Sequence, residues 1–526
     1  MQETGEHEVQ RGGTYRTLDE QEGKLSPAEE RFERGRRTIG LFLGPALLLL
    51  VLLLPLDLEP AQQTLAGIFL FVIVFWITEA IPIPVTAVLG LCLCVALGVA
   101  DGDTVFAAFS SSTIFLFIGG FIIAEAMMVH GLDRRFAFRM LSIPGVAQST
   151  YRTIIVFGSI SLLLSAFISN TASTAMLFPI GLGVMGALSG LIHDQSEGET
   201  DPERLKFSTA LMLMIAYGAS VGGLLTPIGS PPNLIGRAFI EEETDTTISF
   251  FKWILMAAPI VAVMFVVLCV VLIALNKPEI HKLTGGEKYI ESERAKLGPF
   301  SAGERNTMIA FAIAVILWIL PGVVALVAGD ASETYETVLG RLDEGAVAVL
   351  AASLLFFLPV DWKQRKFTLN WNQAVGIDWG TIVLFGAGVA LGTLLSDTGL
   401  AERLGDGISS TLGVTSPVGI TILAVVVAVL ISETTSNTAS VGIVVPIIIP
   451  IAQSAGVDPV IPALAAVFGA SFGFMLPVST PPNAIVYGSG MVPITKMVRS
   501  GAVFDIIGVV LITVGISVTA NAVGLV

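Results

Sequence analysis

Long apolar segments recur along almost the whole sequence, and this feature constrains the fold more than any other. A segment of about 20 apolar residues is long enough to cross the hydrocarbon core of a bilayer. Hydrophobic residues make up 53% of the chain and charged residues only 13%, whereas about 25% are charged in an average soluble domain. A soluble protein of this composition would expose more apolar surface than water tolerates. The sequence therefore predicts an all-α membrane protein that crosses the bilayer many times.

The composition also excludes several other classes of protein. The chain is too apolar to be disordered, and its basic residues are too sparse for a nucleic-acid binder. Cys92, Cys94 and Cys269 all lie in apolar runs, which argues against a disulfide scaffold. We therefore expect the lipid bilayer, and no nucleic acid, among the partners of this chain.

Eleven membrane spans and two interrupted stretches account for the apolar sequence. The spans are expected near 41–56, 61–80, 84–100, 111–130, 207–236, 252–275, 305–328, 343–360, 378–397, 461–490 and 502–522. The stretches 150–190 and 412–453 each contain a polar cluster in the middle. Polar backbone at membrane depth must be buried in protein or line a cavity. We therefore interpret both stretches as re-entrant hairpins whose polar tips lie near the midplane.

The distribution of Lys and Arg favours one orientation in the membrane. With the N-terminus inside, the inner loops carry 24 of the 28 basic residues, and positive charge favours the cytoplasm. The outer loops carry the other four, which are Arg237, Lys252, Arg341 and Arg403. The polar leader is too long and too charged for a secretory signal. We therefore predict a disordered cytosolic tail over 1–38, a first half over 39–275, a cytosolic loop over 276–304 and a second half over 305–526.

The two halves contain the same motifs in the same order. The pentapeptide Ser-Asn-Thr-Ala-Ser occurs at 169–173 and again at 436–440, an offset of 267 residues. Pro-Pro-Asn occurs at 231–233 and at 481–483, an offset of 250 residues. Because the predicted topology opens the two hairpins in opposite directions, the repeats are inverted. Inverted repeats with interrupted helices are typical of secondary transporters, whose binding site lies at the repeat interface near the midplane.

The residues at the two hairpin tips are suited to bind an anion. Ser169 and Ser436 are of a type preferred at helix N-caps. A helix that begins just after each tip leaves free N–H groups and a positive dipole end there, and two such ends that face one cavity form an anion site. The structural alternative is that each triplet only caps or joins buried helices. Two identical copies within one repeat make that alternative the weaker one.

Proline clusters interrupt the spans that follow the two hairpins. The sequence reads Thr-Pro-Ile-Gly-Ser-Pro-Pro-Asn at 226–233 and Leu-Pro-Val-Ser-Thr-Pro-Pro-Asn at 476–483. Each proline removes a hydrogen-bond donor and clashes with the preceding turn. We therefore expect broken helices over 207–240 and 461–490. The carbonyl and hydroxyl oxygens that these breaks release suit a hard cation such as Na⁺, although a structural proline kink is the alternative.

Basic side chains are absent from the sequence around both candidate regions. No Lys, Arg or His occurs in 153–192, in 207–236 or in 404–495. Helix ends supply only about half a charge each. A multiply charged anion held there would therefore need cations bound beside it, which predicts anion transport coupled to a cation gradient.

A few polar and aromatic residues in or near the spans have separate expected roles. Glu79 and Glu433 are costly inside a membrane and could carry a proton or brace the scaffold, and we favour bracing. His130 is expected at the membrane interface, and Trp76 and Trp379 as interface anchors.

Three features of the sequence resemble the divalent-anion:sodium symporter family, which includes the sodium/dicarboxylate cotransporters. They are the paired Ser-Asn-Thr triplets, the two Pro-Pro-Asn elements and the segment Glu79-Ala80-Ile81-Pro82. The likeness runs from about residue 40 to the C-terminus. It implies a homodimer in the cell membrane, in which a transport domain moves as an elevator against a scaffold domain. It also implies C4 dicarboxylate substrates such as succinate, malate and fumarate, with Na⁺ as the coupling ion.

The same resemblance implies a sodium site beside each tip, with substrate between the tips. The first sodium site would comprise Ser165, Ser169, Asn170 and Gly229. The second would comprise Ser432, Ser436, Asn437 and Ser479. The substrate would contact Ser169, Asn170, Thr171, Ser230, Ser436, Asn437, Thr438 and Thr480.

Three alternatives remain open at this point. The nearest is a sodium-independent dicarboxylate exchanger, or a carrier of citrate, sulfate or another oxyanion. An intramembrane serine enzyme is disfavoured, because Ser489 has no histidine in the later spans to activate it. A channel would show ohmic conductance in place of saturable transport. We therefore expect a transporter and not an enzyme.

Overall fold

The structure is a computed structural model. It describes residues 27–195, 205–244, 246–279, 281, 286–329, 332–412 and 416–526. Within these residues the fold is helical, apart from one small antiparallel hairpin of β1 (Pro359–Asp361) and β2 (Lys366–Phe367). The predicted all-α multi-span architecture is therefore confirmed.

The helices follow one another in two halves. The first half contains α2 (Pro27–Leu53), α3 (Pro60–Thr78), α4 (Ile83–Ala96), α5 (Gly102–Phe106), η1 (Ala107–Ser110), α6 (Ser112–Val129), α7 (Leu132–Leu141), α8 (Thr150–Ser165), α9 (Asn170–Gln195), α10 (Lys206–Gly222), η3 (Pro227–Gly229), α11 (Pro231–Glu243), α12 (Phe250–Leu275) and α13 (Gly286–Lys296). The second half contains α14 (Ala302–Ala328), α15 (Glu333–Arg341), α16 (Glu344–Phe357), α17 (Trp371–Ala374), α18 (Trp379–Asp397), α19 (Leu400–Leu412), α20 (Pro417–Thr434), α21 (Asn437–Ser454), α22 (Val460–Ala470), α23 (Pro481–Tyr487) and α24 (Ile494–Ala522).

Nine helices of the described residues are long and apolar enough to cross a membrane. Four shorter apolar helices, α4, α8, α16 and α22, accompany them. Every predicted span lies on one of these helices or on a helix that is interrupted where prolines predict it. Short helices are expected at these interruptions, because proline ends the hydrogen-bonded ladder before a full crossing is made.

The N-terminal region differs from the predicted tail. Residues 1–26 of that tail lie outside the described residues, but α2 begins at Pro27, so the segment before residue 38 is helical. Glu33 and Arg37 on this segment are buried. The sequence suggested disorder because the segment is highly charged, whereas in the fold its charges pair with one another and with Glu79.

The predicted cytosolic loop 276–304 is also partly helical. It contains α13, and α14 begins within it at Ala302 behind a capping box formed by Ser301 and Glu304. Polar sequence alone does not distinguish a surface helix from a loop. The cytosolic connection over 276–304 stays a prediction, and these segments of it are helical.

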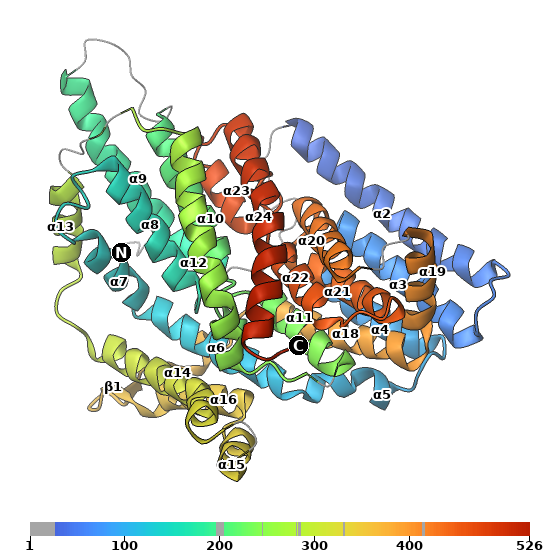
Figure 1. Ribbon diagram of the computed structural model, residues 1–526. Coiled ribbons are helices and arrows are strands. Elements are labelled where there is room, and N and C mark those ends of the chain that lie inside the picture. The colour runs from blue at the N-terminus through green and yellow to red at the C-terminus, as the bar shows by residue number, and fades with distance from the viewer. Residues whose placement is uncertain are drawn as a thin grey trace, which may run out of the picture.

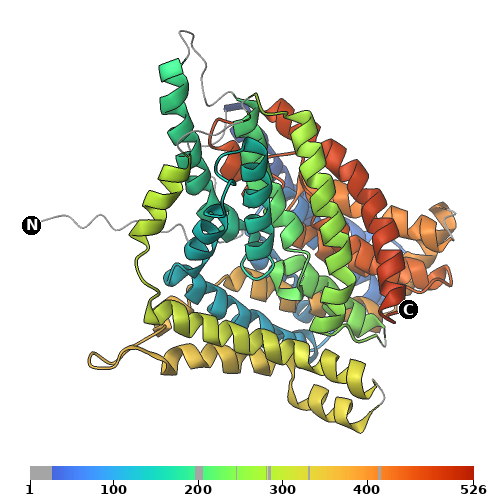
Figure 2. The same cartoon turned by 60° about the vertical axis from the view of Figure 1, so that its left-hand side comes forward.

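Figures 1 and 2 show α14 and α16 as a pair at the lower edge of the molecule. The β1–β2 hairpin and α15 lie at opposite ends of this pair (Figure 2). Helices α2, α3 and α4 pack together on the side away from α8 and α9 (Figure 1).

The two repeats are interlocked through their broken helices. Helix α11, which follows the first break, packs against α21 and α22 of the second repeat. Helix α23, which follows the second break, packs against α9 and α10 of the first repeat. Each half therefore supplies one short helix to the bundle of the other.

The role predicted for Trp76 was wrong. This residue is 1% exposed, its indole Nε1 donates to the Ile83 carbonyl at 3.3 Å, and its ring packs on Gly442. It is a core residue and not an interface anchor, because α3 is covered by α21 at this point. Trp379 is exposed at the start of α18, and its interface role stays a prediction. His130 ends α6, and its Nε2 is hydrogen-bonded to the Thr368 carbonyl at 2.7 Å.

Candidate functional site

The first tip lies between α8 and α9. The Ser169 hydroxyl caps α9 by accepting from the Ala172 N–H at 3.2 Å. The Ser165 hydroxyl donates to Asn170 Oδ1 at 2.6 Å, so the last residue of α8 is joined to the first residue of α9. Gly223 lies so close that a Cβ there would be 2.4 Å from Asn170 Oδ1. The tip is therefore held against the end of α10.

The second tip repeats this construction between α20 and α21. The Ser436 hydroxyl caps α21 by accepting from the Ala439 N–H at 3.2 Å. The Ser432 hydroxyl donates to Asn437 Oδ1 at 2.9 Å and also contacts the Ala470 carbonyl at 2.7 Å. The same residue types thus form the same hydrogen bonds at the offset of 267 that the sequence repeat predicts. The serines of the polar triplets cap helices, as the structural alternative requires, and each tip is also hydrogen-bonded to the helix before it.

The first break is organised by one asparagine. Asn233 Nδ2 donates to the Gly223 carbonyl at 2.7 Å and to the Thr226 carbonyl at 2.8 Å. These carbonyls would otherwise lack partners where the helix unwinds. The Thr226 hydroxyl in turn hydrogen-bonds the Ala166 carbonyl at the first tip. Break and tip are therefore joined directly.

The second break has the equivalent arrangement at an offset of 250. Asn483 Nδ2 donates to the Gly473 carbonyl at 2.9 Å and to the Leu476 carbonyl at 3.0 Å. The Ser479 hydroxyl hydrogen-bonds both the backbone carbonyl of Glu433, at 2.9 Å, and its carboxylate, at 2.7 Å. The uninterrupted helix that would contradict the prediction is absent at both breaks, all of whose residues the structure describes.

Carbonyl oxygens converge around Gly229 in the first break. A side chain at Gly229 would lie 2.6 Å from the Gly223 carbonyl oxygen and 3.0 Å from those of Ser165 and Ala166. Only glycine leaves this space free. Together with Asn170 Oδ1 next to Gly223, these oxygens form a cluster of hard, uncharged donors of the kind that coordinates Na⁺ in transporters.

The predicted site residues differ in their access to solvent. Ser169 is exposed, and Asn170, Thr171, Ser436 and Asn437 are half-buried. The remaining predicted substrate contacts are buried: Ser230, Thr438 and Thr480. The structure thus brings the tip and the break of each repeat together and leaves the tip side chains the more accessible part.

Arginine reaches the second tip from a distant part of the chain. Arg36 Nη1 donates to the Thr434 carbonyl at 3.2 Å, two residues before Ser436. The same guanidinium forms ion pairs with Glu33 at 2.7 Å and with Glu79 at 3.3 Å. Glu79 therefore belongs to an ion-pair network, as the bracing role predicts. Sequence reasoning missed Arg36 as a neighbour of the tip, because nearly 400 residues separate the two.

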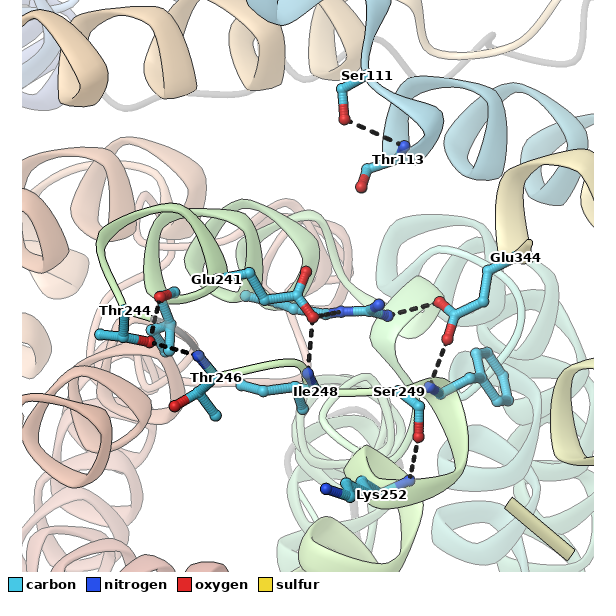
Figure 3. Close-up of polar contacts among 12 residues, drawn as sticks. Ser111, Thr113, Glu241, Thr244, Thr246, Ile248, Ser249, Lys252 and Glu344 are labelled. Atoms are coloured by element: carbon cyan, nitrogen blue, oxygen red, sulfur yellow. Dashed lines mark hydrogen bonds and ion pairs between the residues drawn. The ribbon is translucent and has the colours of Figure 1, made fainter. Parts of the chain in front are cut away.

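A buried arginine joins the middle of α11 to α16. Arg237 ion-pairs with Glu344 of α16 at 2.6 Å and with Glu241 at 3.1 Å (Figure 3). Both carboxylates also accept backbone N–H groups, those of Phe250 and Ile248. Arg237 was predicted in an outer loop, but it is a buried residue of α11. The sequence did not reveal this because its partner Glu344 lies on another helix, 107 residues away.

Comparison with known proteins identifies the family of this chain. The family description "Sodium:sulfate symporter transmembrane region" matches residues 36–526. The chain is 34% identical to the sodium-dependent dicarboxylate transporter SdcS of Staphylococcus saprophyticus over 479 residues. This alignment covers 90% of this chain and 89% of that protein. It is 32% identical over 492 residues to SdcS of Staphylococcus aureus, covering 93% and 92%.

Two solved structures have a similar fold. The YdaH transporter of Alcanivorax borkumensis matches with a TM-score of 0.51 at 16% identity, covering 77% of this chain and 85% of that chain. MtrF of Neisseria gonorrhoeae matches with a TM-score of 0.51 at 13% identity, covering 89% and 97%. At these identities the similarity concerns the fold alone. The sequence match settles the family: the chain is a multi-pass membrane protein that belongs to the sodium:sulfate symporter family, a family of transporters and not of enzymes.

Proposed function

We propose that this protein is a secondary active transporter that takes up C4 dicarboxylates, such as succinate, malate and fumarate, together with Na⁺. The observation that carries the proposal is the pair of equivalent capped tips, each joined to a proline break by the same hydrogen bonds. The names of relatives that match about nine-tenths of the chain support dicarboxylate and sodium as the transported species. The Lys and Arg distribution supports a cytoplasmic N-terminus in the cell membrane.

The tips and breaks supply oxygens for two sodium ions. Ser165, Ser169, Asn170 and Gly229 would hold the first ion, and the carbonyl cluster around Gly229 fits this role. Ser432, Ser436, Asn437 and Ser479 would hold the second. The hydrogen bond between the serine and asparagine of each tip holds the Asn Oδ1 in place, so the helix start and the cation share one rigid support.

The substrate would bind between the two tips. The starts of α9 and α21 present N–H groups and positive dipole ends that attract carboxylates. Ser169, Asn170, Thr171, Ser436, Asn437 and Thr438 would donate to its oxygens, with Ser230 and Thr480 beneath them. Two bound sodium ions would balance its double negative charge. Elevator movement of a transport domain that contains both tips, within a homodimer, would expose the site to each side in turn.

Uptake by purified protein in proteoliposomes tests this proposal. Labelled succinate should accumulate when an inward sodium gradient is imposed, saturate with concentration and be recovered chemically unchanged. Unlabelled malate and fumarate should compete for uptake. Full uptake in sodium-free buffer would remove the symport claim and favour an exchanger. Competition by sulfate or citrate, but not by fumarate, would favour an oxyanion carrier, the alternative suggested by the family description.

A further inference from the structure

The two repeats differ at one position beneath the second tip. Glu433 stands where the offset of 267 places Ala166 in the first repeat. Glu433 is 3% exposed, and its Oε1 accepts from the N–H groups of Phe474 and Met475 at 2.6 and 2.8 Å, while Oε2 accepts from Ser479. Both carboxylate oxygens therefore have donors, which suits an ionised group. This carboxylate braces the second break.

A second carboxyl group lies beside it without any donor. Asp505 of α24 is 4% exposed, and within the described residues neither of its oxygens has a hydrogen-bond partner. Gly501, one turn earlier on α24, packs against the backbone of Phe474 and Met475, the two residues that donate to Glu433. Asp505 follows on the same helix face, which places it beside the segment whose N–H groups bind Glu433.

The surroundings of this carboxyl pair provide no positive charge among the described residues. Helix α24 packs against α12, α20 and α22. Helix α20 presents Glu433, α22 carries no titratable residue, and α12 carries Lys252 at its partly exposed start and Cys269. Tyr217 of α10 also lies near the pair, but its hydroxyl donates to the Phe474 carbonyl at 2.5 Å. On α24 itself, Lys496 and Arg499 lie in the first turns, and Arg499 is exposed.

Two buried carboxylates with no compensating charge are unstable. An ionised carboxylate without donors costs several kcal/mol to bury, and a like charge beside it adds to that cost. An ionisable residue inside a membrane span marks a candidate binding site for an ion or a substrate. Carboxylate oxygens are hard ligands that suit a small cation.

We propose that Asp505 and Glu433 together bind one monovalent cation, in addition to the two sodium ions proposed at the tips. This inference rests on the proposed function. The cation is Na⁺, and it would neutralise the unpartnered Asp505. Because Ser479 joins Glu433 to the second break, the carboxyl pair is linked to the second sodium site. The cation bound by the pair would therefore be carried through the transport cycle with the substrate.

The test measures coupling in proteoliposomes at zero membrane potential for wild type, Asp505→Asn and an exposed control, Asp103→Asn. Each coupled ion multiplies the limiting succinate accumulation by the gradient of that ion, so a tenfold sodium gradient contributes a factor of about ten per Na⁺ ion. If the pair binds Na⁺, Asp505→Asn should accumulate about tenfold less succinate than wild type and the control.

Equal accumulation by wild type and Asp505→Asn under the sodium gradient would overturn the inference. The variant should remain folded, because its amide can donate to the Glu433 carboxylate, and its melting temperature in detergent checks this. The same measurement gives a readout that needs no substrate: added Na⁺ should raise the melting temperature more in wild type than in Asp505→Asn. A wild-type protein that accumulates no succinate would refute the proposed function, whereas equal thermal responses would refute only the cation site.

Discussion

At the residue scale, Asn170 and Asn437 are the side chains on which the proposed site most depends. Each begins a helix, and each holds its Oδ1 against a serine hydroxyl at the end of the preceding helix. In the proposed site, removal of this amide would take away a hydrogen-bond donor to substrate and an oxygen ligand for sodium at once. A hydrogen bond to a charged group contributes about 1.5–3 kcal/mol, which corresponds to about 10- to 150-fold in affinity.

We therefore expect Asn170→Ala and Asn437→Ala each to abolish sodium-dependent succinate uptake while the protein remains folded. The matched control is Asn521→Ala, since Asn521 is an exposed residue whose amide donates to the Ser517 carbonyl far along α24. Uptake by membrane vesicles, normalised to the amount of folded protein, measures the effect. Normal uptake by either tip variant would show that the tips are not the binding site.

A pH effect on stability is expected from Asp133 in α7. Burial raises the pKa of Asp133 to about 6, from an ordinary value of 3.8. The folded state therefore binds the proton more tightly than the unfolded state, and the ionised group destabilises the fold above about pH 6. This cost is on the order of 3 kcal/mol and disappears as the pH falls from about 6 to about 4.

Melting temperatures in detergent at a series of pH values test this expectation. Wild type should gain stability between pH 7 and pH 5 relative to Asp133→Asn, which lacks the titrating group. The exposed control Asp103→Asn should follow wild type. Parallel curves for wild type and Asp133→Asn would contradict it.

The sequence predicts the residues of the tips well and their distant neighbours poorly. Ser169 and Ser436 reveal their role because capping is local and the motif is duplicated. Arg36, Arg237 and Asp505 each depend on a partner that comes near only in the fold. Asp505 did leave a signal, namely an acidic residue inside a predicted span.

At the scale of elements, α2 is fastened to the second tip through Arg36. The guanidinium contacts Glu33 on its own helix, Glu79 after α3 and the Thr434 carbonyl at the end of α20. One side chain thus joins three elements. A largely buried charge network of this kind is sensitive to the loss of one partner, because the remaining charges stay buried.

Arg36→Ala should lower the melting temperature and reduce uptake, with a loss of stability on the order of 2 kcal/mol. Arg31→Ala, an exposed position on α2, is the matched control. If Arg36 and Glu79 act together, the double variant Arg36→Ala/Glu79→Gln should be less destabilised than the sum of the two single variants. Additive losses would show that the pair does not act as a unit.

Elements with a strong local cause are the ones that the sequence predicts. The breaks near Pro231 and Pro481 follow from proline chemistry alone, and the structure places η3, α11 and α23 accordingly. Helix α13 and the first turns of α2 have charged sequences with no apolar period, so the sequence does not predict them as helices, and the structure alone shows them.

At the scale of the whole molecule, the two ends of α16 should face opposite sides of the membrane. The β1–β2 hairpin follows α16 and carries Lys363, Arg365 and Lys366, whereas α15 precedes it and is acidic. Figure 2 shows these two segments at opposite ends of the α14–α16 pair. The positive-inside rule places the β-hairpin in the cytoplasm.

Single cysteines test this orientation in a background that lacks Cys92, Cys94 and Cys269. In intact cells, a membrane-impermeant maleimide should label Glu336→Cys on α15, whose position is exposed, and should leave Gln364→Cys on the β-hairpin unlabelled. Both positions should be labelled after permeabilisation. The reverse pattern would invert the topology.

The interlocking of α11 with α21 and α22 has a consequence for biosynthesis. When the ribosome has completed α11, the 283 residues from 244 to 526 are still to be translated, and they include its neighbours α21 and α22. Until then, α11 lacks the packing partners that α21 and α22 provide, so the first repeat cannot complete its fold in the translocation machinery. Final assembly can begin only near the end of synthesis. Chains that end at residue 400 lack α21 and α22, and we expect membrane proteases to remove them.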